Sequence, residues 1–129
     1  MKYLAIDLGL KRIGLAISLD GEIVTPLKAI IRKNRNQASN EVKEVIKEWE
    51  VDALVVGIPF GGSSEDEMKR RVKHFLSLIG FEKEIFFQDE SGSSIEAKAL
   101  IQGEMKHIRD GRIDSLSAMI ILKRFLKII

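Results

Sequence analysis

Four acidic residues at three separate places in the sequence could together carry out chemistry. Asp7 closes an apolar run, Asp89 and Glu90 close another, and Asp114 precedes a long apolar stretch. Carboxylates that converge repel one another, and a divalent cation is the usual way to keep them ionised together. Two Mg²⁺ or Mn²⁺ ions held in this way can activate water and stabilise the leaving oxygen of a phosphodiester. The acids therefore suggest metal-dependent cleavage of a nucleic-acid backbone.

Each acid also has a purely structural interpretation. Asp7, next to a Leu-Gly turn, can be a turn former, and Asp89 or Glu90 can simply begin a loop. Asp114 can complement the positive end of a helix dipole. Side chains alternate along a strand, so only one of Asp89 and Glu90 should point toward Asp7, and we favour Glu90. The coincidence of three positions favours a functional site.

Basic residues flank the acids. Lys11 and Arg12 follow the turn at Gly9, and a polar, basic loop precedes Asp114. These residues are expected to hold phosphates beside the carboxylates. The candidates in the loop are Lys106, Arg109 and Arg112. The clusters at 32–35, 69–73 and 123–127 are expected to be solvated faces, and the net charge of +2 is by itself weak support for a nucleic-acid partner.

The hydrophobic pattern predicts the elements that must position these residues. Strands are expected at 3–8, 13–18 and 22–25, with the third extended over 28–31, Asp20-Gly21 as a hairpin turn and Pro26 at a sheet edge. A helix is expected over 38–49, and a strand covered on both faces over 53–58. A capping box at Ser64 predicts a helix that ends before Gly80. A strand at 84–88, a short helix with a capping box at Ser93, a loop at 103–111 and a helix at 113–128 complete the chain.

This order of elements predicts an α/β fold of the mixed-sheet type. Hairpins first and right-handed crossovers later give five strands in the order 3-2-1-4-5, with helices on both faces. The first strand is then central and parallel to the fifth. Their carboxyl ends lie at the same end of the sheet, where Asp7 and the strand-five acids would meet.

Composition limits the other possibilities. The 129 residues fit one domain over 1–129, which excludes a two-lobed actin-like ATPase or sugar kinase. There is no cysteine, so disulfides and thiol chemistry are excluded. Apolar stretches fall short of the roughly 20 residues that a membrane helix needs, and no signal segment is expected. We expect a cytoplasmic protein without membrane contact.

Four motifs resemble one known family almost end to end. Residues 7–14, Asp-Leu-Gly-Leu-Lys-Arg-Ile-Gly, follow a family pattern that has Thr where Leu10 stands. Residues 55–59 resemble the family's Val-Gly-Leu-Pro strand, Asp89-Glu90 falls at its Asp-Glu-Arg motif, and Ile113-Asp114 resembles the start of its closing helix. The chain is similar to the YqgF family of candidate pre-16S rRNA nucleases, which are related to Holliday-junction resolvases within the ribonuclease H-like fold.

The resemblance implies a Mg²⁺- or Mn²⁺-dependent endonuclease in 5′-end maturation of pre-16S rRNA. Asp7, Glu90 and Asp114 would be its acidic set. Ser91 replaces the family's arginine, which removes a bidentate phosphate contact. Gly57 stands where related resolvases carry an acid, so the middle ligand must come from strand five.

Two alternatives remain open at this stage. The same acids could resolve branched DNA, which would require a homodimer with two sites rather than a monomer. Ser91 departs from the family pattern, and so does Gly92-Ser93-Ser94, which stands where Leu-Thr-Thr is common. These departures instead favour a non-catalytic RNA-binding factor in ribosome assembly or transcription. Such a factor would bind RNA with a steep salt dependence and cleave nothing with any divalent metal.

Overall fold

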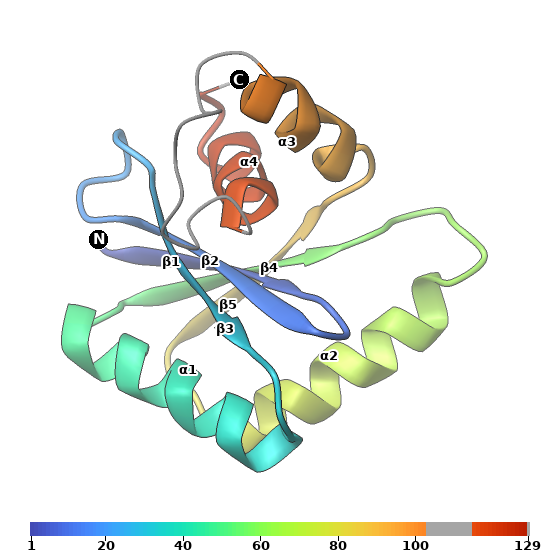
Figure 1. The fold of residues 1–129 in the computed structure, drawn as a ribbon. Helices are drawn as coiled ribbons and strands as arrows, with labels where there is room; N and C mark the ends of the chain where they lie inside the picture. Colours follow the sequence, from blue (N-terminus) through green and yellow to red (C-terminus); the bar gives the residue numbers. More distant parts are fainter. Residues whose placement is uncertain (103–114, 129) are drawn as a thin grey trace.

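The computed structural model describes residues 1–102 and 115–128, which form a mixed sheet with helices on both faces (Figure 1). Its strands lie in the order β3-β2-β1-β4-β5. They are β1 (Tyr3–Leu8), β2 (Arg12–Ser18), β3 (Thr25–Ile31), β4 (Ala53–Ile58) and β5 (Glu84–Asp89). β1 pairs antiparallel with β2 and parallel with β4, and β5 extends the parallel half. The predicted class and strand order are confirmed, and β1 is central.

The helices form two layers, one on each face of the sheet (Figure 1). The first layer is α1 (Arg35–Trp49) and α2 (Glu65–Ile79), and the second is α3 (Ser93–Gln102) and α4 (Leu116–Phe125). None of these helices is both long and apolar enough to cross a membrane.

Alternation along β1 divides the core between the two layers. Leu4, Ile6 and Leu8 are buried in the cluster that includes α1 and α2, whereas Ala5 is buried in the cluster formed by α4. Asp7 has the same phase as Ala5, so it lies on the α4 face. Six residues of α4 are buried, and each large aliphatic side chain among them contributes about 1.5–3 kcal/mol. The helix nearest the acids is therefore firmly docked.

Two local predictions are wrong. The third strand begins at Thr25 rather than at Glu22, because Asp20 Oδ1 accepts hydrogen bonds from the backbone N–H groups of Glu22 and Ile23 at 2.9 and 3.0 Å. These bonds hold the segment in a loop. Pro26 does lie in the edge strand β3, as expected from its missing N–H.

The second wrong prediction concerns helix capping. Ser64 precedes α2, as expected for an N-cap, but its side chain makes no capping hydrogen bond. Ser93 is the first residue of α3, and the capping box predicted there stays a prediction. The complete capping box is at α1, where Asn34 accepts from the Gln37 N–H and Gln37 accepts from the Asn34 N–H. The predicted loop at 103–111 and the start of the last helix at 113 lie outside the described residues.

Candidate active site

Asp7 lies near the carboxyl end of the central strand, on the face covered by α4. It pairs with Gly14 of β2, and its carboxylate is partly buried. The carboxyl ends of the parallel strands β1, β4 and β5 form one edge of the sheet. A side chain leaving β5 at this edge can therefore reach Asp7 across β4.

Glu90 is the side chain that reaches Asp7. It follows β5, and its N–H donates to the Ile58 carbonyl at 3.1 Å, which continues the β4–β5 pairing by one residue. The Glu90 and Asp7 carboxyl groups share a hydrogen bond. The preference for Glu90 over Asp89 as the acid facing Asp7 agrees with this geometry.

Gly57 of β4 leaves the space that Glu90 occupies. A Cβ at this position would lie 2.9 Å from Glu90 Oε2 and 2.5 Å from Ile121 Cδ1 of α4. Neither distance is compatible with normal packing. A side chain at this position of β4 would therefore displace the ends of the Glu90 and Ile121 side chains from where they lie in this structure.

The pKa values of both acids are raised. Burial raises the pKa of Asp7, although the hydrogen bond from Glu90 acts in the opposite direction. Burial also raises the pKa of Glu90 to about 8, with further contributions from the Asp7 charge and their hydrogen bond. The pair therefore tends to retain a proton near neutral pH. Two acids that share a proton form a site prepared to exchange that proton for a cation.

Asp89 has a different environment from Glu90. Its Oδ1 accepts from Ser91 N–H at 3.0 Å, from Ser91 Oγ at 2.7 Å and from Phe60 N–H at 3.2 Å. The hydrogen bonds from Ser91 lower the pKa of Asp89. Asp89 therefore stabilises the turn after β5 and, in this structure, is not directed at Asp7.

The turn from Gly9 to Arg12 is fixed from two sides. Gly9 N–H donates to the Arg12 carbonyl at 3.0 Å, and a Cβ at Gly9 would lie 2.5 Å from that oxygen. Arg32 Nη1 donates to the Gly9 carbonyl, and Arg32 N–H donates to the Lys11 carbonyl, both at 2.8 Å. The side chains of Lys11 and Arg12, which follow the strand that carries Asp7, are exposed.

The remaining predicted site residues lie outside the described residues. These are Lys106, Arg109, Arg112 and Asp114. Ser115, the residue after Asp114, is described and fully buried, and its Oγ accepts from the Leu15 N–H of β2 at 3.0 Å. Leu15 follows Gly14, the partner of Asp7. The start of α4 is thus attached to the sheet beside Asp7.

Arg124 of α4 is a functional candidate that sequence reasoning missed. Its Nη1 donates to the carbonyls of Asp89 and Ser91 at 3.3 and 2.9 Å, and its guanidinium also pairs with Glu96. These carbonyls lie on either side of Glu90 in the chain, so Arg124 fixes the backbone that carries this acid. Its place in a basic cluster gave no sign of this role. Gly57, by contrast, was already notable as a glycine where related resolvases carry an acid.

The carboxylate oxygens of Asp7 and Glu90 suit a hard divalent cation. Mg²⁺ is commonly held by one or two carboxylates and keeps several waters. The part of the chain that the structure describes contains no group of three His, Cys, Asp or Glu side chains that could hold a metal. The donor set described here is therefore a pair, which fits Mg²⁺ or Mn²⁺ with water or a further acid completing the shell.

Solved structures with the same fold identify the class of protein. T. thermophilus RuvC in complex with Holliday junction substrate superposes with a TM-score of 0.62 over 98% of this chain and 94% of that chain, at 16% identity. The fowlpox virus Holliday junction resolvase superposes with a TM-score of 0.57 over the whole of both chains, at 9% identity. The fold is that of the ribonuclease H-like resolvases.

Sequence comparison identifies the family within this class. The family model described as "RuvX: Holliday junction resolvase" matches residues 1–128. A protein of Sulfurimonas denitrificans is 69% identical over 127 residues, which cover 98% of each chain. One from Sulfurovum sp. is 56% identical over 128 residues, which cover 99% of this chain and 100% of the relative. Both are named "Putative pre-16S rRNA nuclease". The chain therefore belongs to the RuvX family, the YqgF family indicated by its motifs.

Proposed function

We propose that this protein is a metal-dependent endonuclease that hydrolyses phosphodiester bonds in structured RNA. The names of its relatives support pre-16S rRNA as the substrate, and the role proposed for it is 5′-end maturation of this RNA in the cytoplasm. The observation that carries the proposal is the close approach of the Asp7 and Glu90 carboxyl groups where β1, β4 and β5 end, in the space left by Gly57. Two acids held together at a partly buried position are costly unless a cation or a reaction uses them.

Asp7, Glu90 and Asp114 are the proposed ligands of Mg²⁺ or Mn²⁺. A cation bound there would supply Lewis-acid activation of water and charge stabilisation at the phosphodiester. Asp114 is included because Ser115, its neighbour in the chain, is anchored to Leu15 beside the Asp7 strand. Asp89 is left out, because its carboxylate is occupied by the turn after β5.

The chain's own groups prepare this site. Glu90 must lose its proton before both carboxylates can bind a cation, so binding releases protons below about pH 8. Gly57 leaves room for the Glu90 carboxylate, and Arg124 fixes the backbone around it. The proposed phosphate contacts are Lys11, Arg12, Lys106, Arg109 and Arg112.

Substitution of the acids tests the proposal. Cleavage of a pre-16S rRNA fragment should require Mg²⁺ or Mn²⁺ and stop with EDTA. Asp7→Asn and Asp114→Asn should each lose more than about 100-fold, since even residues that only support a ligand cost 10–100-fold. Glu48→Gln on α1 is the matched control. Asp89→Asn should cleave at a rate close to that of the control. Equal cleavage by all four variants, each folded, would rule out this site.

Resolution of branched DNA is the second candidate function, favoured by the description of the matching family. A four-way DNA junction should be compared with the RNA fragment under the same conditions, together with the mass of the protein in solution. Symmetric cuts in the junction by a homodimer would favour the resolvase. Faster cleavage of RNA by a monomer would favour the RNA nuclease. Binding without cleavage of either substrate would identify a non-catalytic RNA-binding factor.

A further inference from the structure

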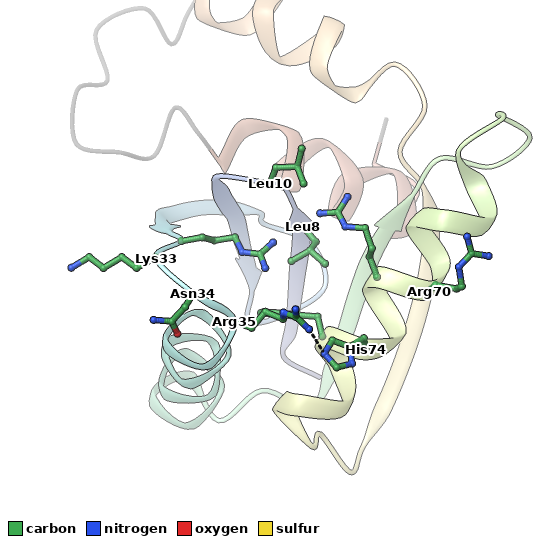
Figure 2. Close-up of a pocket in the computed structure, with 10 residues that line it drawn as sticks. Leu8, Leu10, Lys33, Asn34, Arg35, Arg70 and His74 are labelled. Carbon is green, nitrogen blue, oxygen red and sulfur yellow. Dashed lines mark hydrogen bonds between the residues drawn. The ribbon is translucent and has the colours of Figure 1, made fainter.

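A basic groove opens on the face of the sheet opposite the acids, between the start of α1 and α2 (Figure 2). Its volume is about 670 Å³. Leu8, Leu10 and Phe75 form apolar parts of its wall, and most of its other lining residues are basic. These are Arg32, Lys33, Arg35, Arg70, Arg71 and His74. Two clusters far apart in the sequence, 32–35 and 70–74, thus meet in one place.

No acid neutralises this groove within the described ranges. The ion pairs in these ranges join residues that do not line the groove, such as Lys69 with Glu65 and Lys83 with Asp52. Burial lowers the pKa of Arg32, and the nearby charges of Arg71 and Arg35 lower it further. Like charges held together in this way are unfavourable until an anion binds. The groove is therefore electrostatically incomplete without a ligand that carries several negative charges.

The cations are also positioned before any ligand binds. The Arg32 guanidinium is held by the Gly9 carbonyl and lies 5.6 Å from the centre of the Phe75 ring. Since arginine has five N–H donors, this leaves others for a ligand. Arg35 Nη1 donates to His74 Nε2 at 2.9 Å, as the dashed line in Figure 2 shows. Fixed side chains lose less entropy when they bind a phosphate.

The groove lies just beyond the strand end that carries Asp7. Leu8 lines the groove, and its neighbour Asp7 points to the opposite face of the sheet. The Gly9–Arg12 turn lies between them and is attached to Arg32 of the groove. A polymer that crosses this turn can contact the acids on one side and the groove on the other. A small anion could not do so.

We propose that the basic groove binds the sugar–phosphate backbone of the nucleic acid at a position that flanks the bond held near the acids. The choice of a nucleic acid as the ligand rests on the proposed function, but binding in the groove does not require cleavage. The contacts are to phosphates, so RNA and DNA both carry the required chemistry.

The test is the salt dependence of binding in EDTA, measured by fluorescence anisotropy with an RNA stem-loop. Arg35→Gln/Arg71→Gln removes two charges from the groove. Lys43→Gln/Lys47→Gln on α1 removes two exposed charges elsewhere and is the matched control. Each lost phosphate contact lowers the slope of log K against log salt by about 0.9 on a duplex. The groove variant should therefore lose about 1.8 in slope and bind at least about tenfold more weakly at 0.1 M salt.

The control variant should keep the wild-type slope and affinity within about twofold, and urea unfolding should show that both variants are folded. Equal slopes for the groove and control variants would overturn the inference. A duplex DNA of the same sequence should show the same loss of slope, and a change confined to RNA would overturn the assignment to backbone phosphates.

Cleavage, measured separately with Mg²⁺, distinguishes this inference from the proposed function. If the wild-type protein cleaves RNA while the groove variant keeps its slope, the inference fails alone. If the groove variant loses slope and the wild-type protein cleaves nothing, the proposed function fails and the inference stands.

Discussion

Gly57→Ala tests whether the empty space on β4 positions Glu90. The added methyl group would lie 2.5 Å from Ile121 Cδ1 and 2.9 Å from Glu90 Oε2. Carbon atoms pack best at about 3.5–4.0 Å, so the first contact overlaps by about 1 Å. Overpacking of this kind costs about 1–3 kcal/mol, while replacing a strand glycine recovers about 0.5–1 kcal/mol. The free energy of unfolding should therefore fall by up to about 2.5 kcal/mol.

A double-mutant cycle with Ile121→Val isolates the contact. Valine lacks the Cδ1 atom, and the single substitution should cost about 0.5–1.5 kcal/mol. In the double variant the two changes compensate, so the interaction free energy of the cycle should be about 1 kcal/mol or more. Independent sites deviate from additivity by only about 0.3–0.5 kcal/mol. Urea unfolding of the four proteins measures it. Additive effects would refute the packing argument.

Cleavage should respond differently from stability. Ile121→Val removes the overlap with α4 but leaves the overlap with Glu90, so the Glu90 carboxylate is still displaced in the double variant. We expect cleavage to fall about 10–100-fold in both Gly57 variants, as for other losses of ligand positioning. Full activity in the double variant would show that Glu90 does not depend on this space.

Three further predictions concern the same site. Glu90 has a pKa near 8 when folded and near 4.5 when unfolded, so the folded state binds more protons between these values. The free energy of unfolding of the metal-free protein should therefore fall as pH rises from about 5 to 8, by up to about 2 kcal/mol after screening by water. Glu90→Gln should remove most of this dependence of the urea midpoint on pH. Ser115→Ala leaves the buried N–H of Leu15 without a partner and should cost about 1–3 kcal/mol in urea unfolding, whereas the exposed Ser77→Ala should change stability by less than about 0.5 kcal/mol. Arg124→Met removes the hydrogen bonds to the backbone on either side of Glu90 and should slow cleavage about 10–100-fold. Arg124→Lys should not restore the rate, because lysine lacks the planar guanidinium. Unchanged cleavage would show that Glu90 is held by other contacts.

The sheet could be predicted from the sequence because its signals are strong and local. The continuous apolar run at 53–58 is typical of a parallel strand buried on both faces, and β4 has these bounds. Connection lengths and crossover handedness then define the strand order, which places Asp7 on the central strand. Alternation after β5 predicts that only one of Asp89 and Glu90 faces it but does not say which, and the preference for Glu90 agrees with the geometry of the structure.

Other features depend on packing that local sequence does not encode. The role of Gly57 as a gap depends on how closely Ile121 of α4 approaches the sheet. The basic groove depends on the rotation of α2 about its axis, which brings Arg71 near Arg32 in the connection between β3 and α1. Capping boxes were expected at serines, but the complete one uses Asn34, because several residue types serve as N-caps about equally well.

The hydrogen bond between Ser115 and Leu15 joins residues a hundred positions apart. Until α4 has been synthesised and has docked, Ala5, Ala16 and Val55 remain uncovered, and the Arg124 contacts around Glu90 do not exist. A chain that lacked α4 would thus expose an apolar sheet face to solvent, and the backbone around Glu90 would lose the contacts that fix it.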